Sequence, residues 1–174
     1  YGRLPLHFAD GLPDPTSPDL DAGYSYWDHV DYAVEAAAQR GLFLVILPTW
    51  GDKFHLCWGK GPEIFDEANA YAYGKWIAAR YRDKWNILWM LGGDRPLEPK
   101  HRAIVDAMAA GIREADANHL ITFHPPGAKD STDFLADAPY IDFHTAQTGH
   151  GIEQCYRSDE VMAKMAAATE KPYL

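Results

Sequence analysis

The sequence predicts an α/β fold, a (β/α)8 TIM barrel of which only a part is present, from about the third strand to the start of the seventh. Helical and apolar segments alternate strictly along the chain, and this βα order is typical of a parallel sheet. Each complete apolar run ends in a polar or glycine-rich loop, which is where barrel enzymes carry their working residues. A full barrel needs ~250 residues, so we expect residues 1–174 to form a single partial catalytic domain, truncated at both ends.

The first predicted elements are a loop, a helix and a strand. Residues 1–24 contain four prolines and several aspartates, which favours an irregular loop. A helix follows, with Ser25 as its cap and Gly41 as its stop signal. Its apolar face comprises Trp27, Val30, Val34, Ala37 and Ala38. The run 42–47 is continuously apolar and predicts a strand that is buried on both faces.

The remaining segments continue this alternation. A second helix is expected to begin at Asp66, and its inner face comprises Ala68, Ala72, Trp76 and Ala79. A third helix is expected over 99–115, with Ile104, Val105, Met108, Ile112 and Ala115 facing inward. Further strands are predicted over 86–91, 119–124 and 140–147, further helices near 131–137 and over 158–169, and the start of a strand at 171–174. We expect Trp76, Trp85 and Trp89 to lie in the core.

Composition excludes several classes of partner. The net charge is −9, with 25 acidic against 16 basic residues, and such a chain is poorly suited to nucleic acid or to an anionic membrane. No glycine fingerprint for a dinucleotide or a phosphate follows any strand, and we predict no cofactor. Cys57 and Cys155 have no metal-ligand spacing, and whether they pair is left open. The aromatic content of 13% makes surfaces that stack on flat ligands plausible, although most aromatic rings will fill the core.

Asp94 is the strongest candidate for a catalytic residue. It follows the apolar run 86–91 and the pair Gly92-Gly93, so it is the first side chain presented at the end of a predicted parallel strand. A lone carboxylic acid at that place suits proton transfer. The alternative is that Asp94 caps the next helix or pairs with Arg95.

Other strand ends supply candidate residues for substrate binding. These candidates are Trp50, Asp52, Lys53, Arg95, His124, Gln147 and His150. Trp50 is a stacking platform or a core residue, and Asp52 and Lys53 bind hydroxyl groups or pair with each other. Arg95 orients Asp94 or is solvated, whereas His124 and His150 bind hydroxyl groups or are structural.

Six segments together resemble the apiosidase-like glycoside hydrolases, glycoside hydrolase family 140 and its relatives. They are Trp27-Asp-His-Val-Asp-Tyr32, Leu47-Pro-Thr-Trp-Gly-Asp-Lys53, Trp58-Gly-Lys-Gly-Pro-Glu63, Trp89-Met-Leu-Gly-Gly-Asp-Arg-Pro96, Thr122-Phe-His-Pro-Pro-Gly127 and Gln147-Thr-Gly-His-Gly151. The opening Tyr1-Gly-Arg-Leu-Pro5 is similar to the loop after the second strand of that family. The similarity runs in order along the whole chain.

The resemblance implies a clan A barrel that hydrolyses glycosidic bonds in polysaccharide, with apiose-bearing pectin as a candidate. It implies that Asp94 is the acid/base after the fourth strand. The nucleophile would be a glutamate after the seventh strand, beyond Leu174, so the partners are a carbohydrate substrate and the remaining segments of the same barrel. It also suggests a periplasmic or secreted bacterial protein.

Two other functions stay open from the sequence. A metal-dependent barrel hydrolase of the amidohydrolase type carries histidines on its fifth and sixth strands, roughly where His124 and His144 lie, although His144 with Asp142 is more typical of a structural pair. Against this class, no bridging lysine stands at the tip of the fourth strand. The third possibility is a barrel that binds carbohydrate without catalysis.

Overall fold

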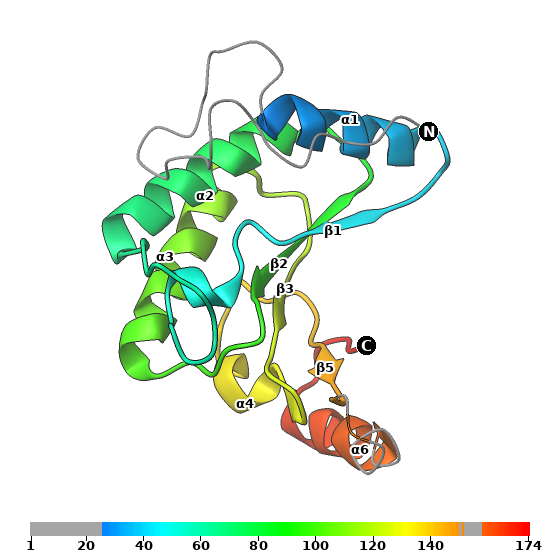
Figure 1. Cartoon of the computed structure of the whole chain (residues 1–174). Coiled ribbons are helices and arrows are strands. Elements are labelled where there is room, and N and C mark those ends of the chain that lie inside the picture. Colours follow the sequence, from blue (N-terminus) through cyan, green and yellow to red (C-terminus); the bar gives the residue numbers. More distant parts are fainter. Residues whose placement is uncertain (1–25, 150, 152–157) are drawn as a thin grey trace.

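A three-stranded parallel sheet organises the chain (Figure 1). The computed structural model describes residues 26–149, 151 and 158–174. The strands are β1 (Leu44–Ile46), β2 (Ile87–Gly92) and β3 (Ile121–His124), in the order β1-β2-β3. The α/β class with a parallel sheet is therefore confirmed. The loop predicted over 1–24, the cap at Ser25 and Cys155 lie outside the described residues.

Helices cover one face of this sheet. α1 (Tyr26–Ala38), α2 (Glu67–Tyr81) and α3 (Pro99–Ala115) precede β1, β2 and β3 in turn. Ile87, Trp89 and Leu91 alternate along β2 and are fully buried in the same apolar cluster as residues of α2 and α3. A side chain at every second position reaches the same face of a strand, so the intervening Leu88 and Met90 point the other way and are only half-buried.

The face of the sheet that these helices do not cover is apolar. Val45 stands opposite Leu88 in the register of β1 and β2, and Val45 is exposed. Leu42 and Phe43, just before β1, are exposed as well, so the prediction of a strand over 42–47 buried on both faces was wrong for this segment. The physical reason is that β1 lies at the edge of the described sheet and has only β2 beside it.

Close backbone contact joins α2 to α3. A Cβ atom added at Gly74 would lie 2.4 Å from the Met108 carbonyl oxygen, and one at Gly111 would lie 2.1 Å from the Tyr71 carbonyl oxygen. α2 begins as predicted, because Asp66 caps it in a reciprocal box with Asn69. α3 has the predicted limits and begins with a proline, which suits the first helical position.

The predicted inner face of α2 was wrong. Ala68, Ala72 and Ala79 are exposed, and the buried residues are instead Ala70, Tyr73, Gly74, Ile77, Ala78 and Tyr81. The large side chains set the face because they have more apolar area to remove from water than alanine has. Trp89 is in the core as predicted and Trp76 packs against it, whereas Trp85 is exposed and meets Phe43 edge to face.

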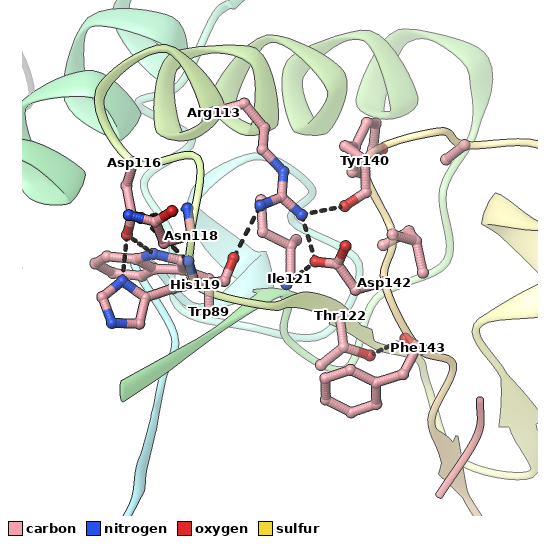
Figure 2. Close-up of polar contacts among 12 residues, drawn as sticks. Trp89, Arg113, Asp116, Asn118, His119, Ile121, Thr122, Tyr140, Asp142 and Phe143 are labelled. Atoms are coloured by element: carbon pink, nitrogen blue, oxygen red, sulfur yellow. Dashed lines mark hydrogen bonds and ion pairs between the residues drawn. The ribbon is translucent and has the colours of Figure 1, made fainter. Parts of the chain in front are cut away.

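The segment after β3 forms less regular strand structure than predicted. Only Ala146–Gln147 (β5) of the predicted strand 140–147 forms a ladder, antiparallel to Lys129–Asp130 (β4), and His144 makes a single parallel bridge to Tyr173. Thr122 Oγ1 donates to the Phe143 carbonyl oxygen at 2.7 Å, and the Asp142 N–H donates to the Ile121 carbonyl oxygen at 2.9 Å (Figure 2). The segment therefore runs beside β3, but side chains replace part of the backbone ladder. The last helices are α4 (Thr132–Leu135) and α6 (Ser158–Ala168).

A polar cluster fixes the turn from α3 into β3 (Figure 2). The buried Asp116 accepts a hydrogen bond from Trp89 Nε1 at 3.0 Å and others from the backbone N–H groups of Asn118 and His119. Arg113 reaches across to the Tyr140 carbonyl oxygen and to the Asp142 carboxylate. This cluster precedes β3, so it lies at the end of the sheet opposite to the loop that carries Asp94.

Within the described ranges, no helix has both the length and the apolar character needed to cross a membrane.

Candidate active site

Glycines bring the loops after β1 and β2 into contact. Gly92 and Gly93 have backbone φ angles of 92° and 120°, which residues other than glycine rarely adopt. The Gly51 N–H donates to the Gly93 carbonyl oxygen at 3.2 Å, and a Cβ atom at Gly93 would lie 2.5 Å from the Gly51 nitrogen. The two glycines of the 92–94 segment therefore place Asp94 directly beside Trp50 and the 3-10 turn Gly51–Lys53.

Asp94 has a strained backbone and a partly exposed carboxylate. Its φ is 60°, an uncommon left-handed conformation for a residue other than glycine, and such strain clusters at functional sites. The Asp94 N–H donates to His124 Nδ1 at 3.2 Å, and the same ring nitrogen lies 3.0 Å from the Pro125 carbonyl oxygen. Trp58 Nε1 donates to Asp94 Oδ2 at 3.3 Å, and the side chain keeps 29% of its surface exposed. The carboxylate is therefore open to solvent within the described part of the chain.

Arg95 is buried behind Asp94. Its Nη1 donates to the Asp94 carbonyl oxygen at 2.6 Å and lies 3.6 Å from Asp94 Oδ2. The guanidinium group lies 4.8 Å from the centre of the Trp58 ring, a cation–π contact. Only 3% of the side chain is exposed, so the alternative of a solvated arginine was wrong. Arg95 therefore contacts both the Asp94 backbone and the Trp58 ring beside the carboxylate.

Asp52 and Lys53 support the loop that carries Trp58. Asp52 Oδ2 accepts hydrogen bonds from the backbone N–H groups of Lys60 and Gly61, at 3.2 and 3.1 Å. Lys53 Nζ donates to the Gly61 carbonyl oxygen and lies 3.4 Å from Asp52 Oδ2. The structure thus shows Asp52 and Lys53 in contact with each other and with the 57–61 loop.

Two exposed tryptophans flank the site. Trp50 is 45% exposed and meets the His124 ring edge to face at 5.3 Å, so the described residues leave its ring open to solvent. Trp58 is 55% exposed and was not among the predicted site residues. Its place in the glycine-rich loop before Gly59 was the signal that could have identified it, because exposed aromatic rings in such loops are available to ligands.

The structure brings most, but not all, of the predicted residues together. Gln147 lies in β5, opposite Lys129, and its buried Oε1 has no hydrogen-bond partner among the described residues. Within the described residues, no hydrogen bond or ion pair joins it to Asp94. His150 lies outside the described residues.

Within the described residues, neither His124 nor His144 belongs to a group with metal-ligand geometry. His144 is fully buried and its Nδ1 lies 2.7 Å from Ser131 Oγ, which is a structural contact. Within the part of the chain that the structure describes, the one group with metal-ligand geometry comprises His55, Glu98 and His101. It contains neither His124 nor His144.

Known structures similar to this chain are glycoside hydrolases. A crystal structure described as a glycoside hydrolase family 5 from Bacteroides vulgatus ATCC 8482 superposes with a TM-score of 0.74 at 32% identity, over 89% of this chain and 35% of that one. A structure described as a glycoside hydrolase superposes with a TM-score of 0.76 at 32% identity, over 89% of this chain and 37% of that one. The chain therefore spans little more than a third of the length of either structure.

Similarity at the level of families covers the whole chain. The family described as "Apiosidase-like, catalytic domain" matches residues 1–174. No match was found among the curated proteins. Because the family match extends from the first residue to the last, and the strand-end geometry agrees with a barrel hydrolase, this chain belongs to the apiosidase-like catalytic domain family.

Proposed function

We propose that the protein containing this chain is a glycosidase that hydrolyses glycosidic bonds in polysaccharide, with Asp94 as its acid/base. The observation that carries the proposal is the strained Asp94, whose carboxylate is held at a strand end by Trp58 and Arg95 and remains open to solvent. The family match and the similar glycoside hydrolase structures support the same reaction class. Apiose-bearing pectin is a candidate substrate.

We propose that this chain supplies part of a (β/α)8 barrel, from about the third strand to the start of the seventh. The apolar face formed by Val45, Leu88 and Met90 supports this proposal, because the interior of such a barrel is filled by apolar side chains. Other segments of the protein would complete the barrel and supply the nucleophilic glutamate.

The reaction follows from two carboxyl groups on opposite sides of the scissile bond. Asp94 donates its proton to the glycosidic oxygen while the bond from that oxygen to the anomeric carbon breaks, and the glutamate attacks that carbon. Asp94, now ionised, then takes a proton from the water that releases the sugar. Trp50 and Trp58, exposed beside Asp94, stack on sugar rings. His124, whose ring contacts Trp50 and the Asp94 backbone, binds a hydroxyl group of the substrate.

Asp94→Asn in the intact enzyme tests this function. Asparagine tolerates the left-handed backbone and keeps the size of the side chain, but it cannot donate the acid proton. We expect turnover on the natural glycan to fall by ~10²–10⁴, the usual share of general acid catalysis. An activated aryl glycoside, whose leaving group needs little protonation, should lose less rate in the glycosylation step.

The matched control is Asp83→Asn, which changes the same functional group on a side chain that is 91% exposed. Turnover should then stay at the wild-type value on both substrates. Near-normal turnover of Asp94→Asn on the glycan would remove Asp94 from the acid/base role.

A further inference from the structure

Three potential metal ligands meet beside the candidate active site. They are His55, in the loop after the 3-10 turn, Glu98, which caps α3, and His101, in the first turn of α3. One ligand atom from each lies within 4.8 Å of the others. Glu98 and His101 are three residues apart, so they lie on the same face of the helix. The group is separate from the side chains that surround Asp94.

His101 is the least expected member of this group. It is 1% exposed, and neither of its ring nitrogens has a hydrogen-bond partner among the described residues. A buried polar group without a partner destabilises a fold. One of these two ring nitrogens can offer its lone pair to a metal ion.

His55 already has the tautomer of a metal ligand. Its Nδ1–H donates to the Pro96 carbonyl oxygen at 2.9 Å, which leaves the lone pair on Nε2. Histidines that bind metals usually donate their other ring N–H to a carbonyl or carboxylate in this way. The ring is partly exposed, so an ion can enter from solvent.

Carboxylates supply the negative charge that a divalent ion needs. Glu98 Oε2 lies 3.9 Å from His101 Nδ1 on an exposed side chain that can adjust its position. Glu63 accepts a hydrogen bond from the Leu56 N–H at 2.7 Å, and its charge acts on both His55 and His101. That backbone hydrogen bond lowers the pKa of Glu63, which keeps it ionised.

The side chains of His55, Glu98 and His101 must rearrange to bind one ion. The His55 and His101 rings stack with centroids 3.8 Å apart and planes 18° apart, so their nitrogen lone pairs lie in two nearly parallel planes and do not meet at one point. Coordination to one ion therefore requires the more exposed His55 ring to tilt. Ligand atoms at a tetrahedral zinc ion lie ~3.3 Å apart, given bonds of ~2.0–2.1 Å. The ligand atoms of His55, Glu98 and His101 lie within 4.8 Å of one another, so they must move closer together when an ion binds.

We propose that His55, Glu98 and His101 bind one divalent transition-metal ion, for which Zn²⁺ is the best match. Two imidazoles and one carboxylate form a donor set that suits zinc, with the fourth position open to water. The ion joins the loop that leads to Trp58 to the segment that leads from Asp94 into α3. Its role is to fix these two loops relative to each other, and the proposal does not depend on the reaction at Asp94.

Calorimetric titration of Zn²⁺ into the intact, untagged, chelator-treated protein at pH 7.5 tests the site. We expect one equivalent of Zn²⁺ to bind and to raise the Tm. His55→Gln and Glu98→Gln, which change exposed or partly exposed positions, should each weaken binding by at least ~10-fold, the lower range seen for altered metal sites. The controls His29→Gln and Glu67→Gln change the same residue types in α1 and α2 and should bind as the wild type does.

A second readout uses Co²⁺ in place of Zn²⁺. Ligand-field absorption from one bound Co²⁺ should appear in the wild type and in both controls, and it should be lost or shifted in His55→Gln. The proposal is overturned if the folded wild type binds no stoichiometric Zn²⁺. It is equally overturned if His55→Gln and Glu98→Gln, with wild-type circular dichroism, bind the ion with unchanged affinity.

Discussion

Single residues at the strand ends form the candidate active site of this chain. The pattern of a buried strand followed by Gly-Gly-Asp predicted the place of Asp94, because the period of the strand and the freedom of glycine are local properties. The sequence could not predict that Trp58 donates to that carboxylate, because the contact joins residues 36 positions apart. Nor could it reveal the His55 and His101 pair, which forms only when two loops pack together.

Trp50→Ala in the intact enzyme should weaken substrate binding more than it destabilises the fold. The indole is 45% exposed and, among the described residues, its ring meets His124 edge to face, so its removal creates no cavity in the described core. We expect KM to rise severalfold while Tm changes little. Trp85→Ala is the control, since that ring is also exposed but lies away from the site. An unchanged KM with a lowered Tm would show that Trp50 serves stability alone.

Helices and strands with a strong hydrophobic period were predicted well. A segment that is fixed by long-range side-chain hydrogen bonds was not. α3 has the predicted limits because its proline and its apolar period agree. The strand predicted over 140–147 is mostly irregular because Thr122 and Asp142 make long-range contacts that compete with the ladder. The predicted inner face of α2 was wrong because the alanines on its exposed side also recur at helical spacing.

Gly74→Ala should destabilise the protein although alanine favours a helix. The added Cβ would lie 2.4 Å from the Met108 carbonyl oxygen, so α2 and α3 must move apart. We expect the free energy of unfolding, measured with urea, to fall by ~1–3 kcal/mol, the range for overpacked cores. Ala72→Gly, on the exposed face of the same helix, should cost about 0.5–1 kcal/mol through propensity alone. A stabilised Gly74→Ala protein would contradict the packing described.

The turn between α3 and β3 should make stability depend on acid pH. Burial alone would raise the pKa of Asp116, but hydrogen bonds from Trp89 and from the backbone of His119 outweigh it and hold that pKa below its usual range. The stabilisation is complete above the unfolded pKa of ~3.9 and is lost as pH falls through the lower folded pKa. Asp116→Asn should therefore lower Tm at pH 7 and flatten the loss of Tm in acid. A Tm profile parallel to that of the wild type would refute this.

At the scale of the whole molecule, the described sheet leaves apolar surface uncovered. Val45, Phe43 and Trp85 are exposed around the edge strand β1, and large apolar patches on an edge invite association. If the chain is part of a larger barrel, residues 1–174 expressed alone should be poorly soluble or should lack a cooperative thermal transition. A soluble monomer of these residues that unfolds cooperatively would show that the chain is a self-sufficient unit.

The central claim is that Asp94 works with a second carboxylate from another segment of the same barrel. A crystal structure of the intact protein measures the distance between these two carboxyl groups directly. We predict that a glutamate at the C-terminal end of a later strand faces Asp94 at ~5–5.5 Å, the separation of retaining glycosidases. A separation of ~6.5 Å or more would point to inversion, and the absence of any carboxylate facing Asp94 would contradict the account.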